Sequence, residues 1–213
     1  MTSFQTLVLV RHGRVHNPNH VVYADLPGFD LDAHGVLEAH TTAQRLAGSP
    51  IDAVISSPLA RALTTARAIA APHGLDVVID PDLTEWQLSE QWIGVAWDDL
   101  PTVAPGQLEA YLRSPHDLGF AAESLEELSF RMQSVVESQI GSLPSTTVIV
   151  SHQDPISALT LALTGAPLSD LLVHPPKHAS TTVLERERGE TWSLRGRWSP
   201  DVGSGASGLS LEW

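Results

Sequence analysis

The chain has 213 residues, of which 42% are hydrophobic and 17% are charged, so it is long enough to bury one well-packed domain and does not have the composition of a disordered protein. It contains no cysteine, which excludes disulfides, thiolate catalysis and cysteine-ligated zinc. The formal net charge of -13 should repel nucleic acid and anionic membranes, and we expect neither as a partner.

The first residues of the chain carry no targeting pattern. The segment Met1–Gln5 has no basic residue, and the apolar run Leu7–Val10 is too short for a signal-peptide core or a membrane span. We therefore expect a cytoplasmic protein that does not enter the membrane.

Short apolar runs that do not alternate with polar residues predict strands buried on both faces, as in a parallel sheet. In chain order these runs are Thr6–Val10, Ile51–Ile55, Val77–Ile79 and Thr146–Val150. Apolar and alanine residues at helical spacing predict helices over Val36–Leu46, Leu59–Ala71 and Ser124–Ile140, and from Asp154-Pro155 to about Leu163. Strand and helix alternate, which predicts an α/β fold: a layered α/β/α sandwich with a mostly parallel central sheet.

The remaining segments have other patterns. Ser57-Pro58 is typical of an N-cap followed by proline in the first turn of a helix. Residues 86–122 have weak periodicity, three tryptophans and several prolines and glycines, which indicates an insertion or lid. The runs Thr181–Glu185 and Thr191–Arg195 predict a hairpin at the sheet edge. We expect one domain over residues 1–198, followed by a Gly/Ser-rich tail over 199–213.

A histidine motif follows the first predicted strand. Arg11, His12 and Gly13 stand at its carboxyl end, and ligands bind at the carboxyl ends of strands in open α/β sheets. Glycine lets the backbone approach a ligand closely, so we expect the Gly13 N–H to be free to donate to it. A three-residue match of this kind is also common in loops that bind nothing.

Further candidate residues follow the other predicted strands. Arg61 lies about one helical turn after Ser57, His152 comes directly after the fourth strand, and Glu85 lies a few residues after the third. Taken singly, these are an ordinary helix arginine, a structural histidine and a surface glutamate. Because all of them come just after strands and none just before, we expect them to share one site with His12.

The order of these motifs resembles that of a known family. Arg11-His12-Gly13, the run Ser56–Ala62 and the pair Ser151-His152 are similar to the motifs of the histidine phosphatase superfamily, which has the phosphoglycerate-mutase-like fold. The resemblance covers about residues 5–198. It implies a phosphoglycerate-mutase-like α/β fold and a reaction that passes through a phosphohistidine.

The resemblance also implies a role for each of five residues. His12 would accept the phosphoryl group, His152, Arg11 and Arg61 would clamp it, and Glu85 would donate a proton to the leaving group. Elementary chemistry agrees with these roles, because phosphoryl transfer needs positioning and charge neutralisation. We expect nearby cations to lower the pKa of His12, and a site closed from water to raise the pKa of Glu85.

The sequence departs from the family pattern at two places. Many members have an acidic residue after the Arg-His-Gly motif, where this chain has Arg14. The element Trp92-Ile93-Gly94 stands farther from Glu85 than the family pattern predicts, which makes Glu90 a rival proton donor.

The sequence therefore predicts a phosphatase that hydrolyses a small phosphomonoester through a phosphohistidine on His12. The arginines would supply the positive charge, so we expect no metal and no other cofactor. Two alternatives remain: a phosphoglycerate-mutase-type phosphotransferase of the same superfamily, and a non-catalytic protein that binds a phosphorylated ligand. The sequence leaves the substrate and the oligomeric state open, with a homodimer among the alternatives.

Overall fold

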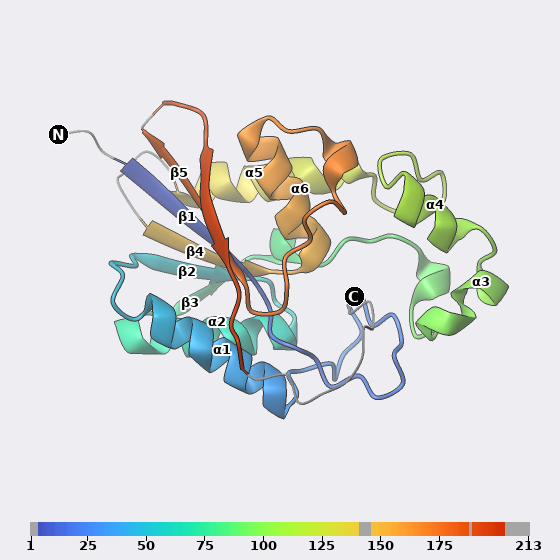
Figure 1. The fold of residues 1–213 in the computed structure, drawn as a ribbon, viewed down its shortest axis with the longest axis horizontal. Helices are drawn as coiled ribbons and strands as arrows, with labels where there is room; N and C mark the ends of the chain where they lie inside the picture. The colour runs from blue at the N-terminus through green and yellow to red at the C-terminus, as the bar shows by residue number, and fades with distance from the viewer. Residues whose placement is uncertain (1–3, 141–145, 188, 203–213) are drawn as a thin grey trace.

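One central sheet organises the computed structural model, which describes residues 4–140, 146–187 and 189–202 (Figure 1). The described strands are β1 Phe4–Arg11, β2 Ala53–Ser56, β3 Val77–Ile79, β4 Thr146–Ser151, β5 Thr181–Glu187 and β6 Ser193–Trp198. They lie in the order β3-β2-β4-β1-β5-β6. The first four of these neighbours pair in parallel, and β5 and β6 add an antiparallel hairpin beside β1. The carboxyl ends of β1, β2 and β4 therefore meet at one edge of the sheet.

Two pairs of helices cover the two faces of the sheet (Figure 1). On one side lie α1 Ala33–Leu46 and α2 Ala60–Ala70, and on the other lie α5 Leu125–Ile140 and α6 Gln153–Thr164. Residues of β1 alternate between the two cores, since Val8 and Val10 pack toward α2 while Leu7 and Leu9 pack toward α5 and α6. The α/β/α sandwich with a mostly parallel sheet is thus confirmed.

The strand β3 differs from its prediction. Its residues Val77–Ile79 form the expected strand, but it lies at the edge of the sheet, where Val78 and Ile79 are 47% and 52% exposed. The expectation that it is buried on both faces is wrong, because an apolar run alone does not tell an edge strand from a central one.

Helix starts show how local chemistry sets the boundaries. Ser124 and Glu127 form a reciprocal capping box at the start of α5, where each side chain accepts from the other's backbone N–H. The N-cap of α2 is Leu59, so the prediction that Ser57 caps this helix is wrong. The Ser57 hydroxyl instead contacts His152.

The segment 86–122 extends beyond the sheet and its four flanking helices, to the right in Figure 1. It contains the one-turn helices η3 Glu90–Trp92 and η4 Trp97–Asp99 and the short helices α3 Leu100–Val103 and α4 Gln107–Arg113. Elsewhere, one-turn helices span η1 Ala71–His73, η2 Pro81–Leu83 and η5 Leu168–Asp170. None of the helices in the described ranges is long and apolar enough to cross a bilayer. Most of the predicted tail, from residue 203 onward, lies outside the described residues.

Candidate active site

The ends of β1 and β4 bring two histidines together. Arg11 pairs with Ser151 at the end of the parallel ladder, and the His12 N–H donates to the Ser151 carbonyl at 3.0 Å. His152 follows as the N-cap of α6, and its ring centroid lies 5.1 Å from that of His12. Both side chains are buried. The two histidines predicted from different motifs therefore occupy one edge of the sheet.

Two arginines complete this cluster, which we call the cationic centre: Arg11, His12, Arg61 and His152. The guanidinium groups of Arg11 and Arg61 are buried, at 4% and 1% exposure. Two positive charges with this little solvent strongly favour an anion between them. The four side chains that were expected to come together at the ends of the strands do lie close together in the structure.

The ring of His12 is held in one tautomer. Its Nδ1 lies 2.8 Å from the Gly13 carbonyl oxygen, which can only accept a hydrogen bond, so Nδ1 carries the proton and Nε2 carries the lone pair. Burial lowers the pKa of His12 well below its usual value of 6.5, and the charge of Arg61 lowers it further. The imidazole is therefore neutral, with its lone pair on Nε2.

Arg11 has a side-chain N–H donor that is not used within the described part of the chain. Its Nη1 donates to Gln153 Oε1 at 2.7 Å and to the Pro176 carbonyl at 2.9 Å. These bonds fix the guanidinium, whereas its buried Nε has no hydrogen-bond partner in the described part of the chain. A buried donor without a partner costs free energy unless a ligand accepts its hydrogen bond.

Arg61 and His152 are hydrogen-bonded to each other. Arg61 Nε lies 3.3 Å from His152 Nδ1, and since arginine only donates, Nδ1 accepts. His152 Nε2 then carries the proton and donates to Ser57 Oγ at 2.8 Å. Burial is the main cause that lowers the pKa of His152 well below 6.5. Arg61 Nη2 also donates to the Ala24 carbonyl, so the loop after β1 covers this arginine.

Gly13 does not act as expected. Its N–H donates to Thr65 Oγ1 at 3.1 Å, so the expectation that this N–H is free for a ligand is wrong. A glycine is needed here for a packing reason: a Cβ at Gly13 would lie 2.5 Å from the carbonyl oxygen of Gly35 in α1. Thr65 also donates to the Arg61 carbonyl, which ties the loop of His12 to the helix of Arg61.

Arg14 is bonded to acidic residues at the start of α1 and within it. Its Nε forms a salt bridge with Asp32 at 2.7 Å, and its backbone N–H donates to Glu38. Asp32 also caps α1 through the Gly35 N–H. The side chain that departs from the family pattern therefore anchors the start of α1.

Glu85 lies beside the cationic centre with a raised pKa. The carboxylate is half-buried, and its Oε1 accepts from the Trp86 N–H at 2.8 Å. Burial, followed by the nearby charge of Asp154, raises the pKa of Glu85 to about 7. The predicted direction is confirmed, and Glu85 is thus partly protonated near neutral pH.

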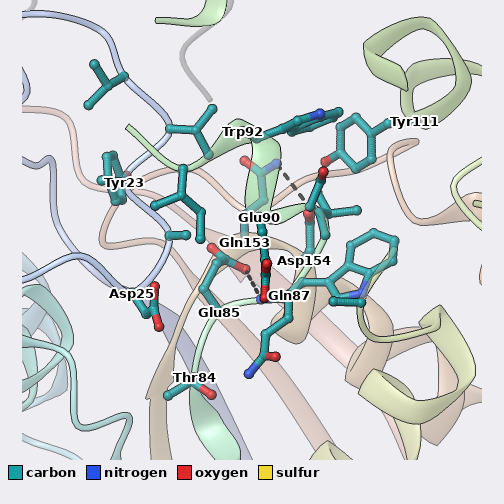
Figure 2. Close-up of a pocket in the computed structure, with 18 of the residues that line it drawn as sticks. Tyr23, Asp25, Thr84, Glu85, Gln87, Glu90, Trp92, Tyr111, Gln153 and Asp154 are labelled. Atoms are coloured by element: carbon teal, nitrogen blue, oxygen red, sulfur yellow. Dashed lines mark hydrogen bonds between the residues drawn. The ribbon is translucent and has the colours of Figure 1, made fainter. Parts of the chain in front are cut away.

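A cavity of about 270 Å³ adjoins the cationic centre, and we call it the acidic pocket. Figure 2 shows Glu85, Glu90 and Asp154 in its wall together with Trp92 and Tyr111. Its other lining residues include Arg11, Tyr23, Asp25 and Trp86. Glu90 is exposed, whereas Glu85 is partly buried within reach of the charges of Arg61 and Arg11.

Several residues of this site are not predicted from the sequence. Asp154 was recognised only as the start of a helix, yet its Oδ2 accepts from the Tyr111 hydroxyl at 3.0 Å in the pocket wall. His178 lies with its ring centroid 5.8 Å from that of His12. The position of Asp154, two residues after His152 in the first turn of α6, was a usable signal. Nothing local marks Tyr111 or His178, because long-range packing brings them here.

No group of three or more histidine, aspartate or glutamate side chains that could hold a metal ion occurs within residues 4–140, 146–187 and 189–202. Of the carboxylates in the acidic pocket, Glu85 accepts from a backbone N–H, and Asp154 accepts from the Tyr111 hydroxyl and the Gln153 amide. The site does contain a pair of buried guanidinium groups, those of Arg11 and Arg61.

The chain is similar in sequence and in fold to known proteins. Over 163 residues the chain is 39% identical to the uncharacterized protein Rv0525 of Mycobacterium tuberculosis. The aligned region covers 74% of this chain and 77% of that protein. It is 30% identical over 183 residues to phosphoserine phosphatase 1 of Hydrogenobacter thermophilus, covering 85% and 86%. A mycobacterial glucosyl-3-phosphoglycerate phosphatase solved with VO3 superposes with a TM-score of 0.82 at 26% identity, covering 92% of this chain and 100% of that one.

Residues 7–198 also match the family described as histidine phosphatase superfamily (branch 1). This match spans most of the chain and includes all four residues of the cationic centre. The chain therefore belongs to the histidine phosphatase superfamily.

Proposed function

We propose that this member of the superfamily is a phosphatase that hydrolyses a small phosphomonoester through a phosphohistidine on His12. The observation that carries the proposal is the state of His12: a neutral imidazole, with Nε2 free of protons, close to two buried arginines. A dianionic phosphoryl group is attracted to such a place and meets a nucleophile there.

In the first step, the Nε2 lone pair attacks phosphorus as the bond between phosphorus and the ester oxygen breaks. The leaving oxygen keeps the electron pair and takes the proton of Glu85. Arg11 would bind a phosphoryl oxygen through its unpartnered Nε. Oxygens that enter between Arg61 and His152 would replace the contact that these two side chains now make with each other.

In the second step, a water oxygen attacks phosphorus while the Glu85 carboxylate takes a proton from that water. The phosphorus–nitrogen bond breaks, its electron pair returns to Nε2, and inorganic phosphate leaves. The same carboxyl group thus serves as acid and then as base, for which a pKa of about 7 is well placed. The guanidinium groups supply the positive charge throughout, so the proposed reaction needs no metal.

The test is to trap the intermediate. The protein is mixed with p-nitrophenyl phosphate, quenched in alkali and digested, and the peptide that contains His12 is searched by mass spectrometry for added phosphate. We expect the modification on His12, and we expect His12→Ala to lose it together with at least about 10⁴-fold in kcat. A chelator should not change the rate.

The alternatives give other results. A variant His12→Ala that keeps near wild-type kcat would overturn the mechanism, and a protein that binds phosphate without modification would be a non-catalytic binder. A mutase would transfer the phosphoryl group to an added phosphoglycerate faster than to water. Loss of activity in chelator with recovery on adding a divalent ion would refute the metal-free reaction.

A further inference from the structure

The acidic pocket has an unusual charge balance for a site beside a phosphoryl group. Four carboxylates line it, those of Asp25, Glu85, Glu90 and Asp154, and Arg11 is the one cation in its described lining. Arg11 is held in place by its bonds to Gln153 and to the Pro176 carbonyl. The part of the substrate that leaves as the alcohol would therefore meet carboxyl groups on several sides, of which Glu85 is the one that carries a proton in the proposed reaction (Figure 2).

None of these four carboxylates forms an ion pair with a cationic side chain in the described ranges. Asp154 is 7% exposed and is bonded to neutral donors, the Tyr111 hydroxyl and the Gln153 amide. Buried carboxylates are ordinarily paired with positive charge, since burial without a partner is costly. The pocket thus has anionic groups that an incoming cation would pair.

Aromatic rings form another part of the wall, beside aliphatic and neutral polar side chains. Trp92 packs edge-on against Tyr111 with their centroids 6.0 Å apart, and Trp86 lies 6.1 Å from the same ring. The indole N–H groups of Trp86 and Trp92 donate outside the pocket, to the Glu123 carbonyl and to Gln107. These rings therefore present carbon surface to the cavity. Aromatic faces combined with carboxylates are the surroundings that alkylammonium groups prefer.

We infer that the acidic pocket selects phosphomonoesters whose alcohol part carries an ammonium group and no second anionic group. This inference rests on the proposed phosphatase function and names its substrate class. The phosphoryl group binds in the cationic centre, and the ammonium group lies between the aromatic rings and the carboxylates of the adjoining pocket. A carboxylate on the alcohol part would face Asp154 and Glu90, while Arg11, the one cation of the described lining, would be paired with the phosphoryl group.

The test uses two matched pairs of substrates. Phosphocholine and 3,3-dimethylbutyl phosphate have the same shape and differ in the charge of one atom. Phosphoethanolamine and phosphoserine differ by one carboxylate. We expect kcat/KM for phosphocholine to exceed that of its uncharged isostere by about tenfold. We expect phosphoethanolamine to exceed phosphoserine by a similar factor.

Variants separate recognition from the intrinsic reactivity of the leaving groups. Asp25 and Glu90 are exposed, so the double variant Asp25→Asn, Glu90→Gln should fold normally. It should lower the ratio of kcat/KM between phosphocholine and its isostere, because it removes two of the charges that pair with the ammonium group. The matched control Glu137→Gln removes a carboxylate from the exposed face of α5 and should leave that ratio at the wild-type value.

Each outcome decides the inference. Equal or better turnover of the uncharged isostere, faster turnover of phosphoserine than of phosphoethanolamine, or a ratio that the double variant leaves unchanged would overturn it. A clear preference for sugar phosphates would overturn it as well, since hydroxyl groups also bond to carboxylates and stack on aromatic rings. Failure of the proposed function looks different, because p-nitrophenyl phosphate would then leave no phosphate on His12.

Discussion

The cationic centre and the acidic pocket share a wall but are built in opposite ways. The centre is made by strand ends and the first turns of helices, and its histidines and arginines are almost fully buried. The pocket is made largely by the loops over 21–25 and 84–122, and it carries carboxylates and aromatic rings. Arg11 belongs to both regions.

The contrast indicates a division of labour. The centre offers little besides positive charge and a neutral imidazole, which is suited to a phosphoryl group attached to any alcohol. The pocket surrounds the alcohol and differs in charge and polarity from the centre. Under the proposed function, the sheet edge would determine the type of reaction and the loops would determine the choice of substrate.

The largest effect that tests this division is expected at Glu85, where the two regions meet. Glu85→Gln should lower kcat for an alkyl phosphate by roughly 10²–10⁴-fold, because the alkoxide leaves poorly without a proton. With an aryl phosphate, whose leaving group needs no proton, the rate of His12 phosphorylation should fall much less. Single-turnover phosphorylation measures this step separately from the later attack by water.

The control for this prediction is Glu90→Gln, which removes the rival carboxylate of the same loop. It should leave the phosphorylation rates of both substrates close to those of the wild type when neither substrate carries a cation. An equal loss for the alkyl and aryl esters in Glu85→Gln, or a loss only in Glu90→Gln, would show that Glu85 is not the acid.

The cationic centre could be predicted from the sequence because its residues follow directly from strand ends. A strand that ends at Arg11 places His12 at the sheet edge whatever the rest of the chain does, and the parallel partner places His152 beside it. Gly13 shows the limit of this reasoning. Its need for glycine arises from the close approach of Gly35, which is a tertiary contact.

The next effect concerns this contact and the stability of the centre. Gly13→Ala should lower the free energy of unfolding by about 1–3 kcal/mol, since the added methyl group meets backbone that cannot move freely. It should also lower kcat, because the Gly13 carbonyl orients the His12 ring. Urea denaturation followed by circular dichroism measures the first effect, and a kinetic assay measures the second.

Gly48→Ala is the matched control, since a Cβ at Gly48 has nothing within 4 Å. It should change the free energy of unfolding by less than about 0.5 kcal/mol. A Gly13→Ala variant as stable as Gly48→Ala would show that the approach of the loop to α1 is looser than the structure has it.

The third effect is a pH dependence that links the two regions. Glu85 acts as an acid only when protonated, and its pKa of about 7 means that the protonated fraction falls above neutral pH. The kcat/KM for an alkyl phosphate should therefore decline above pH 7, approaching tenfold per pH unit. For an aryl phosphate the phosphorylation step should lack this decline. A flat profile for the alkyl ester up to pH 9 would contradict the assignment.

Most of the lining of the acidic pocket cannot be predicted from the sequence, and the reason is physical. The periodicity of residues 86–122 is too weak to assign their side chains to a face, so the sequence predicts no neighbour for Tyr111. Its contact with Asp154 joins positions 43 residues apart. The lid assigned to this segment stays a prediction, although its residues do line the pocket.

The smallest expected effect tests whether the contact between Tyr111 and Asp154 influences the pKa of Glu85. The Tyr111 hydroxyl donates to Asp154, and the charge of Asp154 is one cause of the raised pKa of Glu85. Tyr111→Phe removes the donor but keeps the ring that packs on Trp86 and Trp92. Without the donor the pKa of Asp154, which burial already raises, should rise further, so Asp154 is neutral over a wider range of pH.

A neutral Asp154 no longer opposes ionisation of Glu85, so the pKa of Glu85 should fall. The decline of kcat/KM for an alkyl phosphate should then begin at a lower pH in Tyr111→Phe than in the wild type, and the variant should lose about 1 kcal/mol of stability with its hydrogen bond. Asp154→Asn should shift the profile in the same direction, and adding Tyr111→Phe to it should shift the profile no further, because both changes act through the same charge. A profile that stays in place or moves to higher pH would show that Tyr111 and Asp154 shape the pocket wall without setting the protonation of Glu85.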